Sequence, residues 1–239
     1  MKRALVTGGS GGIGAAICAR LARAGLHVVV HAHRNRDAAE QVVEAIIDAG
    51  GSAETAVFDV ADGAACATAL VKLLEAGPIQ VLVNNAGIHA DAPLAGMSTE
   101  QWHRVIDVSL HGFYNVTQPL LLPMLRTRWG RIVSISSVAG VMGNRGQANY
   151  AAAKAGLHGA SKSLAQEIAA RGVTVNVVAP GIIATAMAEQ AFGKEQIEQL
   201  VPVQRAGTPD EVAALVAFLA SEEAGYITAQ VISINGGMV

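Results

Sequence analysis

The run Ala4-Leu5-Val6-Thr7-Gly8-Gly9-Ser10-Gly11-Gly12-Ile13-Gly14 joins a predicted strand to a predicted helix through a glycine-rich turn. The apolar residues from Ala4 to Val6 predict a short buried strand, and the pattern from Ile13 to Ala24 predicts a helix closed by Gly25. Glycines in such a turn let the backbone approach a pyrophosphate, and the positive end of the following helix favours its charge. The spacing, Gly-x-x-x-Gly-x-Gly, differs from the usual dinucleotide pattern. We nevertheless expect a dinucleotide to bind through Gly8, Ser10, Gly12, Ile13 and Gly14.

Apolar runs alternate with helical segments along the rest of the chain. Strands that are apolar on both faces, each followed by a helix, are typical of a parallel sheet covered on both sides. Right-handed connections then give a doubly wound α/β sheet of the Rossmann type. Because the sequence shows no linker or repeat, we expect a single domain over residues 1–239, with about seven strands and helices on both faces.

The remaining elements follow from the same patterns. The least regular segment, residues 182 to about 205, follows the sixth predicted strand and is the expected lid over a substrate. Further strands are expected at residues 28–30, 53–58, 79–83, 131–135, 173–178 and 231–234, and further helices at 37–49, 62–75, about 101–126 with possible interruptions at Pro119 and Pro123, about 149–170 and 209–220.

Composition argues against several classes of protein. The chain is 51% hydrophobic and 15% charged, with a net charge of −2, so we expect no nucleic-acid partner. Cys18 and Cys66 stand in apolar helical contexts without metal-ligand spacing, which predicts buried free thiols, no metal site and a cytoplasmic location. The apolar run after Met1-Lys2-Arg3 is too short for a signal peptide or a membrane span, so we expect no membrane association.

The end of the second predicted strand indicates which cofactor the turn would bind. An acidic side chain there usually holds a 2′-hydroxyl, and a basic one holds a 2′-phosphate. No carboxylate occurs from His31 to Arg36. Arg34 is well placed to pair with a phosphate, supported by Arg36 or His33, which favours NADPH. The alternative is an ordinary exposed basic turn.

Three polar side chains are expected to meet at the carboxyl edge of the sheet, where open α/β sheets bind ligands. Ser137 ends the apolar run at residues 131–135. Tyr150 and Lys154 are four residues apart in an alanine-rich helix, which places them on one face. A Tyr-x-x-x-Lys pair alone is more often a surface pair, so the interpretation depends on Ser137 and the glycine turn as well. Asp59-Val60 and Asn84-Asn85-Ala86-Gly87 also follow strands, although each could be simple turn chemistry.

With these motifs, the chain resembles the classical short-chain dehydrogenase/reductases over essentially all of its 239 residues. Within that family it is most similar to the 3-oxoacyl-[acyl-carrier-protein] reductases of fatty acid synthesis. The similarity is carried by the glycine turn, Asn84 to Gly87, Ser137, Tyr150-x-x-x-Lys154, Pro180-Gly181-Ile182-Ile183-Ala184-Thr185, the segments Gly143 to Gly156 and Val173 to Gly181, and the tail Asn235-Gly236-Gly237-Met238.

The resemblance implies NADPH-dependent reduction of a 3-oxoacyl group carried by acyl carrier protein. Tyr150 would donate the proton, Lys154 would lower the pKa of Tyr150 and hold the ribose, and Ser137 would orient the substrate oxygen. The resemblance also implies a homotetramer in which Arg128 and Arg171 dock the acidic carrier protein. The further cofactor contacts that it implies are Asp59 and Val60 at the adenine, Asn84, Asn85, Ala86 and Gly87 along the cleft, Pro180 and Gly181, and Ile183 and Thr185 at the nicotinamide carboxamide.

Two departures from the family pattern affect this interpretation. Ser109 stands where the family usually has a catalytic-site asparagine, and Gly11 stands where many NADPH-using members have a basic residue. A serine hydroxyl can also bond helix backbone but is shorter, so Ser109 either substitutes in the catalytic site or slows turnover. The alternatives are a reductase of an accessory polyketide or aryl-polyene pathway or of another ketone or alcohol, and a weakly catalytic nucleotide-binding scaffold.

Overall fold

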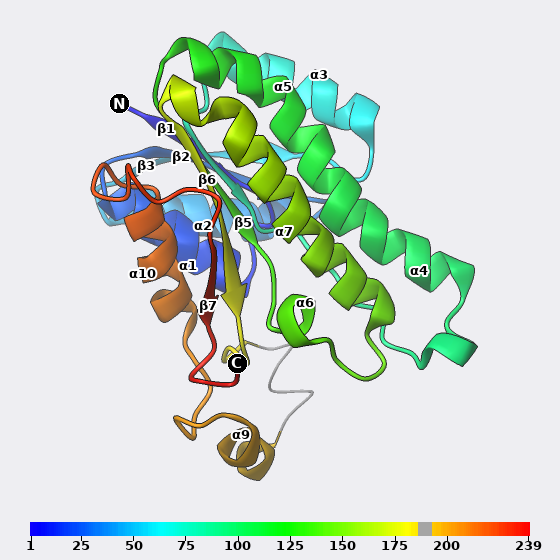
Figure 1. Cartoon of the computed structure of the whole chain (residues 1–239). Helices are drawn as coiled ribbons and strands as arrows, with labels where there is room; N and C mark the ends of the chain where they lie inside the picture. The colour runs from blue at the N-terminus through cyan, green and yellow to red at the C-terminus, as the bar shows by residue number, and fades with distance from the viewer. Residues whose placement is uncertain (186–192) are drawn as a thin grey trace.

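The sheet has seven strands, all paired in parallel: β1 (Arg3–Val6), β2 (His27–Ala32), β3 (Ser52–Val57), β4 (Val81–Asn84), β5 (Gly130–Ile135), β6 (Val173–Pro180) and β7 (Val231–Ile234). The computed structural model describes residues 1–185 and 193–239, and within them the strand order is β3-β2-β1-β4-β5-β6-β7 (Figure 1). The order reverses between β1 and β4, so their carboxyl ends flank the crevice where doubly wound sheets bind ligands. The predicted Rossmann-type α/β fold is confirmed.

Helices cover both faces of the sheet (Figure 1). One face carries α1 (Gly12–Arg23), α2 (Arg36–Asp48) and α10 (Pro209–Leu219), and the other carries α3 (Gly63–Glu75), α5 (Gly112–Arg126) and α7 (Ala148–Ile168). Alternate strand residues serve the two faces, as the pleat requires. In β2, for example, Val28 and Val30 pack into the first core and Val29 into the second. Burial on both faces explains why the strands read as continuous apolar runs.

Side-chain caps explain where several helices begin. Asn35 and Asp62 accept hydrogen bonds from first-turn amides of α2 and α3. Ser98 forms a capping box at the start of α4 (Thr99–Ile106). In contrast, α1 follows Gly11 and has no side-chain cap among the described residues. The first amides of α1 therefore stay available at the carboxyl edge of the sheet.

The long helix expected at about residues 101–126 consists of three segments. After α4, one turn of π-helix, η2 (Asp107–His111), leads into α5. The possible interruptions at Pro119 and Pro123 do not occur, because both prolines lie inside α5. Each proline removes a helix hydrogen bond at a cost of about 3 kcal/mol. Core burial offsets that cost, since α5 buries Val116, Leu120 and Met124 completely.

Other boundaries differ modestly from the expected ones. The second strand continues through Ala32, and the sixth continues through Pro180. Of the expected lid, the structure describes residues 182–185 and 193–205, and residues 186–192 lie outside the described residues. The short elements that the sequence did not predict are η1 (Leu94–Gly96), α6 (Ala139–Met142), η3 (Ala169–Arg171) and α9 (Lys194–Leu200).

Cys18 and Cys66 are buried free thiols, which confirms that prediction. Burial raises the pKa of both thiols, to about 11 for Cys66, so neither is a reactive thiolate near neutral pH. Within residues 1–185 and 193–239, no three His, Cys, Asp or Glu side chains gather in a way that could hold a metal ion. The helices of this described part are all too short or too polar to span a membrane.

Candidate active site

The glycine turn lies at the carboxyl end of β1, beside the turn that follows β4. The Thr7 hydroxyl oxygen accepts hydrogen bonds from the amides of Asn85 and Ala86, both at 3.0 Å. In return, the Asn85 side-chain amide donates to the carbonyls of Thr7 and Gly8, at 2.9 and 3.1 Å. These reciprocal bonds hold the two turns together. Three of the expected cofactor contacts, Gly8, Asn85 and Ala86, therefore share one edge of the sheet.

The backbone of the glycine turn forms an open cradle. Gly8 has a φ of +63°, which residues with a side chain rarely adopt. A Cβ at Gly14 would lie 2.1 Å from the carbonyl oxygen of Gly8, so only glycine fits there. Gly12 is exposed at the start of α1, and a Cβ on it would lie 3.2 Å from the Cγ2 of Thr185. A close backbone at an uncapped helix start suits a pyrophosphate.

The residues expected to select the cofactor surround the end of β2. Arg36 pairs with Glu40, and His33 pairs with Asp59, each at 3.3 Å. Arg34 is exposed and forms no ion pair within the described residues. The supporting roles considered for His33 and Arg36 thus compete with existing carboxylate partners, whereas Arg34 is available to an anion.

Ser137, Tyr150 and Lys154, the three residues expected to be catalytic, lie together at the carboxyl edge of β5, and we call them the catalytic cluster. The Ser137 hydroxyl accepts a hydrogen bond from the Ala139 amide at 3.1 Å and interacts with the Tyr150 phenol. The Lys154 ammonium is buried and donates to the carbonyl of Ile135 at 2.8 Å. It lies 5.6 Å from the ring centre of Tyr150. A hydroxyl, a phenol and an ammonium are therefore neighbours at the end of this strand.

Burial dominates the protonation of the catalytic cluster. It raises the pKa of the Tyr150 phenol, while the Ser137 hydroxyl acts against this rise and Asp91 adds to it. Burial also lowers the pKa of the Lys154 ammonium to about 8. Lys154 is not among the groups that shift the Tyr150 pKa in this structure, so its expected lowering by Lys154 together with a charged nicotinamide stays a prediction.

Gly87 connects the catalytic cluster with the turn after β4. A Cβ at Gly87 would lie 3.0 Å from the Nζ of Lys154 and 3.7 Å from the Oγ of Ser109. The end of β6 is close as well, because the Val138 amide donates to the carbonyl of Pro180 at 2.7 Å. The catalytic cluster and the glycine turn thus belong to one continuous site.

The other expected cofactor contacts lie at the ends of several different strands, and some of them also bond to the core. Val60 is buried, and its carbonyl accepts from the side chain of Asn115 at 2.9 Å. Asn84, expected along the cleft, donates to the hydroxyl of Thr117 in α5 at 3.1 Å and lines a small cavity beside Ala86. Beyond β6, the Gly181 amide donates to the Ile234 carbonyl at 3.0 Å, and Ile183 pairs with Gly207 in an isolated parallel bridge.

A family model described as short chain dehydrogenase matches residues 2–196. The chain belongs to the short-chain dehydrogenase family. It is 46% identical over 236 residues to the 3-oxoacyl-[acyl-carrier-protein] reductase FabG of Aggregatibacter actinomycetemcomitans, covering 98% of each chain. It is 48% identical over 238 residues to the 3-oxoacyl-[acyl-carrier-protein] reductase of a Synechocystis strain, and the match covers 99% of this chain and 96% of that relative. It is also 48% identical over 242 residues to the acetoacetyl-CoA reductase of Shinella zoogloeoides, and the match covers 98% of this chain and 97% of that relative.

Membership makes this chain an oxidoreductase with a nicotinamide cofactor. The residues present fit such a group. The cradle at Gly8 and Gly14 has no space for side chains, and the adjoining start of α1 is uncapped. At the other end of the site, a Cβ on Gly87 would lie 3.0 Å from Lys154 Nζ, so the glycine lets the ammonium lie close to the backbone there.

Ser109, the departure from the family pattern, lies in the π turn η2. It is 4% exposed, and no hydrogen-bond partner for its hydroxyl exists among the described residues. A cavity of about 10 Å³ beside it, also lined by Thr7 and Phe113, is just large enough for one water molecule. In this short-chain dehydrogenase the helix irregularity is present with a serine in place of the usual asparagine.

Asn149 is a residue of the site that sequence reasoning did not single out. Its side-chain amide donates to the carbonyls of Ala90 and Gln101, at 3.0 and 3.1 Å, and its side-chain oxygen accepts from the Tyr150 amide at 2.8 Å. It thus ties the loop after β4 and the start of α4 to α7, next to Tyr150. The available sequence signal was an asparagine directly before Tyr150, at the start of an alanine-rich helix, and the structure shows that it is buried.

Arg128 and Arg171 lie at the opposite edge of the sheet from the catalytic cluster. Both are exposed, Arg128 just after α5 and Arg171 at the end of η3. They are close together, because a Cβ at Gly172 would lie 2.4 Å from the Arg128 carbonyl oxygen. The six residues of β5 separate this pair from the catalytic cluster by a distance on the order of 20 Å.

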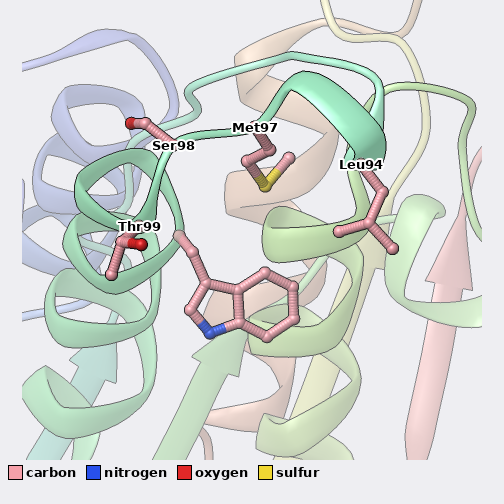
Figure 2. Close-up of a pocket in the computed structure, with 5 residues that line it drawn as sticks. Leu94, Met97, Ser98 and Thr99 are labelled. Atoms are coloured by element: carbon pink, nitrogen blue, oxygen red, sulfur yellow. The ribbon is translucent and has the colours of Figure 1, made fainter.

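A hollow of about 240 Å³ lies between η1 and the start of α4. Figure 2 shows Leu94 and Met97 on its η1 side and Thr99 on the helix side. The catalytic cluster does not line this hollow, so it is separate from the reacting centre. Its lining residues are Leu94, Met97, Ser98, Thr99 and Trp102.

Proposed function

We propose that the chain catalyses the NADPH-dependent reduction of 3-oxoacyl-[acyl-carrier protein] to 3-hydroxyacyl-[acyl-carrier protein], in fatty acid or related acyl-chain synthesis. The observation that carries the proposal is the continuity of the catalytic cluster with the glycine turn, where a Cβ on Gly87 would lie 3.0 Å from Lys154 Nζ. Relatives with that activity in their names, 46% and 48% identical over nearly the whole chain, support it.

Reduction of a ketone requires a hydride and a proton, and a bound nicotinamide supplies the hydride to the carbonyl carbon. Tyr150 donates its phenolic proton to the carbonyl oxygen, so that the C=O π bond becomes a C–H and an O–H bond. Its raised pKa keeps the phenol protonated near neutral pH, as a proton donor must be. Ser137 donates a hydrogen bond to the same oxygen and orients it, and Lys154 stabilises the phenolate left on Tyr150.

The preference for NADPH rests on Arg34. A guanidinium without a carboxylate partner, at the end of β2, is suited to pair with a 2′-phosphate. Gly8, Ser10, Gly12, Ile13 and Gly14 would hold the pyrophosphate, and Asp59 and Val60 would lie at the adenine. Lys154 and Tyr150 would hold the ribose of the nicotinamide half, and Ile183 and Thr185 its carboxamide.

Arg128 and Arg171 would dock the carrier protein, which is acidic. Since they lie on the order of 20 Å from the catalytic cluster of their own chain, docking there links the carrier proposal to the proposed homotetramer, in which a neighbouring subunit can present its site. Apolar side chains on α5 support such an assembly, because Tyr114 is 64% and Leu122 is 67% exposed.

Residues 182 to about 205 remain our proposed substrate lid. The described helix within it, α9, contains no buried residue, and Leu200 at its end is 50% exposed. A helix so weakly packed against the domain moves at low cost in free energy, whereas Ile183 and Val201 on either side of it are buried.

A second candidate substrate is acetoacetyl-CoA, because one of the similar relatives, 48% identical, carries that activity in its name. Both substrates present a 3-oxoacyl thioester to the same catalytic cluster. They differ in what carries the thioester, so the basic pair at Arg128 and Arg171 distinguishes them.

Charge reversal of this basic pair tests the choice of substrate. The double variant Arg128→Glu/Arg171→Glu should lower kcat/KM for acetoacetyl-carrier protein by about tenfold or more, while kcat/KM for acetoacetyl-CoA changes little, because only the carrier protein meets the pair. A matched control is Arg20→Glu, an exposed arginine on α1. Equal losses with both substrates would contradict docking at Arg128 and Arg171.

A further inference from the structure

His31 lies in β2 next to the glycine turn, and none of the roles proposed above uses it. It is 1% exposed. The Gly8 amide donates a hydrogen bond to Nδ1 of its ring at 3.0 Å. On the other side of the ring, Nε2 lies 2.8 Å from the carbonyl oxygen of Phe58. His31 therefore connects the glycine turn to the residue that follows β3.

These two contacts fix the tautomer of the ring. A carbonyl oxygen can only accept, so Nε2 carries the proton, and a backbone N–H can only donate, so Nδ1 is bare. The ring is therefore neutral. Burial is the main reason that the pKa of His31 is lowered to about 4, and nearby His33 lowers it further. The hydrogen bond to Phe58 and the charge of Asp59 raise this pKa in part. A protonated ring would set a second N–H against the Gly8 amide.

The main chain and the ring face of His31 add two further contacts. Its carbonyl accepts from the Gly9 amide at 2.8 Å, and its ring centre lies 4.2 Å from that of Phe58. Two consecutive amides of the glycine turn thus end on one residue. Thr7 and Asn85 hold the turn from the β4 side, whereas His31 holds it from the β2 side.

We propose that His31 is a positioning residue for the nicotinamide cofactor, whose Nδ1 fixes the Gly8 amide and with it the direction of the glycine turn. The proposal rests on the proposed binding of NADPH at that turn. Gly8 is the position where the backbone takes its left-handed conformation, so the orientation of its peptide sets where the following glycines and the start of α1 lie. A shift there would displace the amides that meet the pyrophosphate.

Substitution of His31 by asparagine or by glutamine tests the roles of the two ring nitrogens separately. In His31→Asn the side-chain oxygen can occupy the place of Nδ1 and accept from Gly8, but nothing reaches Phe58. In His31→Gln the side-chain nitrogen can occupy the place of Nε2 and donate to Phe58, but the Gly8 amide loses its acceptor. We expect the Kd of NADPH, measured by fluorescence titration, to rise about tenfold in His31→Gln and only about two- to threefold in His31→Asn.

The kinetic constants separate positioning from general damage. The KM for NADPH should follow its Kd in both variants, with kcat within about twofold of wild type, because the catalytic cluster does not touch His31. The matched control is His27→Gln, since His27 lies at the start of the same strand and bonds Ser52 and Glu54 instead. It should leave the Kd unchanged.

The outcomes distinguish this inference from the proposed function. Equal Kd values in His31→Asn and His31→Gln would overturn the positioning role of Nδ1 and leave the proposed function intact. A wild-type chain that binds neither NADPH nor NADH would overturn the proposed function and this inference with it. If His31→Gln does not fold, His31→Phe keeps the ring against Phe58 without either nitrogen and should show the same tenfold loss. If neither folds, His31 is a residue of the core and the positioning role is wrong.

Discussion

The Lys154 ammonium donates a 2.8 Å hydrogen bond to the carbonyl oxygen of Ile135, the last residue of β5. This buried bond joins α7 to the sheet and fixes where the ammonium stands beside Tyr150. The same burial lowers the pKa of Lys154 to about 8, so the group is still mostly charged near neutral pH. The position of the Lys154 ammonium and its lowered pKa therefore both follow from its burial between α7 and the sheet.

Replacement of the ammonium tests this environment. Lys154→Met should lower kcat/KM by about 100-fold, because the phenolate of Tyr150 loses the charge that stabilises it. It should also change how stability depends on pH. The folded-state pKa of about 8 lies below the usual 10.5, so the unfolded chain binds more protons between these values. The free energy of unfolding of wild type should therefore rise, relative to the variant, as pH increases from 8 to 10.5.

Urea denaturation of both proteins at about pH 7.5 and pH 10 measures this difference. Lys162→Met is the matched control, because Lys162 is an exposed lysine on the same helix and should follow wild type. A Lys154→Met variant whose stability changes with pH just as wild type does would show that Lys154 titrates as an ordinary surface lysine.

Removal of the Tyr150 hydroxyl should abolish reduction without preventing cofactor binding. Tyr150→Phe should lower kcat by about 1,000-fold, since the proton donor is lost, while the Kd of NADPH stays within about threefold. Tyr114→Phe, at an exposed tyrosine on α5, should have normal activity. Loss of NADPH binding in Tyr150→Phe would mean that Tyr150 supports the structure of the cleft and is not the acid.

Two buried serines near Lys154 should respond in opposite ways to truncation. Ser109→Ala should leave the free energy of unfolding unchanged or raise it by up to about 1 kcal/mol, because the hydroxyl has no partner among the described residues. Ser136→Ala should lower it by about 1–3 kcal/mol, since the Ser136 hydroxyl bonds the Lys154 carbonyl at 2.9 Å and His158 at 2.7 Å. Thermal and chemical denaturation measure both. A comparable loss in Ser109→Ala would show that Ser109 is bonded.

The fold and much of the site could be predicted because their signals are local. The glycine turn joins a strand to a helix within a dozen residues, and the spacing of Tyr150 and Lys154 fixes one helix face. The alternation of strands and helices predicted the doubly wound parallel sheet, although not its strand order. These features depend on short-range geometry and on the handedness of the connections.

The parts that could not be predicted depend on contacts between distant segments. The sequence placed His31 in a basic turn, but β2 continues through it and buries its ring against Phe58. The π turn at Ser109 adds one residue to a helix without any distinct residue pattern. The raised pKa of Tyr150 could not be predicted either, because its largest cause is the burial of the phenol in the folded chain.

The exposed guanidinium of Arg34 should decide the cofactor preference. Arg34→Ser should raise the KM for NADPH by about tenfold and leave the KM for NADH within about twofold, because only NADPH carries the 2′-phosphate. Arg20→Ser is the matched control on α1. Equal changes in the KM values for NADPH and NADH would show that Arg34 does not set the cofactor preference.

The most direct test follows the loss of NADPH absorbance with the wild-type chain and three substrates: acetoacetyl-carrier protein, acetoacetyl-CoA and a simple ketone without a thioester. We predict turnover of both thioesters, with the highest kcat/KM for the carrier-protein substrate, and faster oxidation of NADPH than of NADH. Turnover of the simple ketone alone, or of none of the three, would contradict the assignment of this site to 3-oxoacyl thioesters.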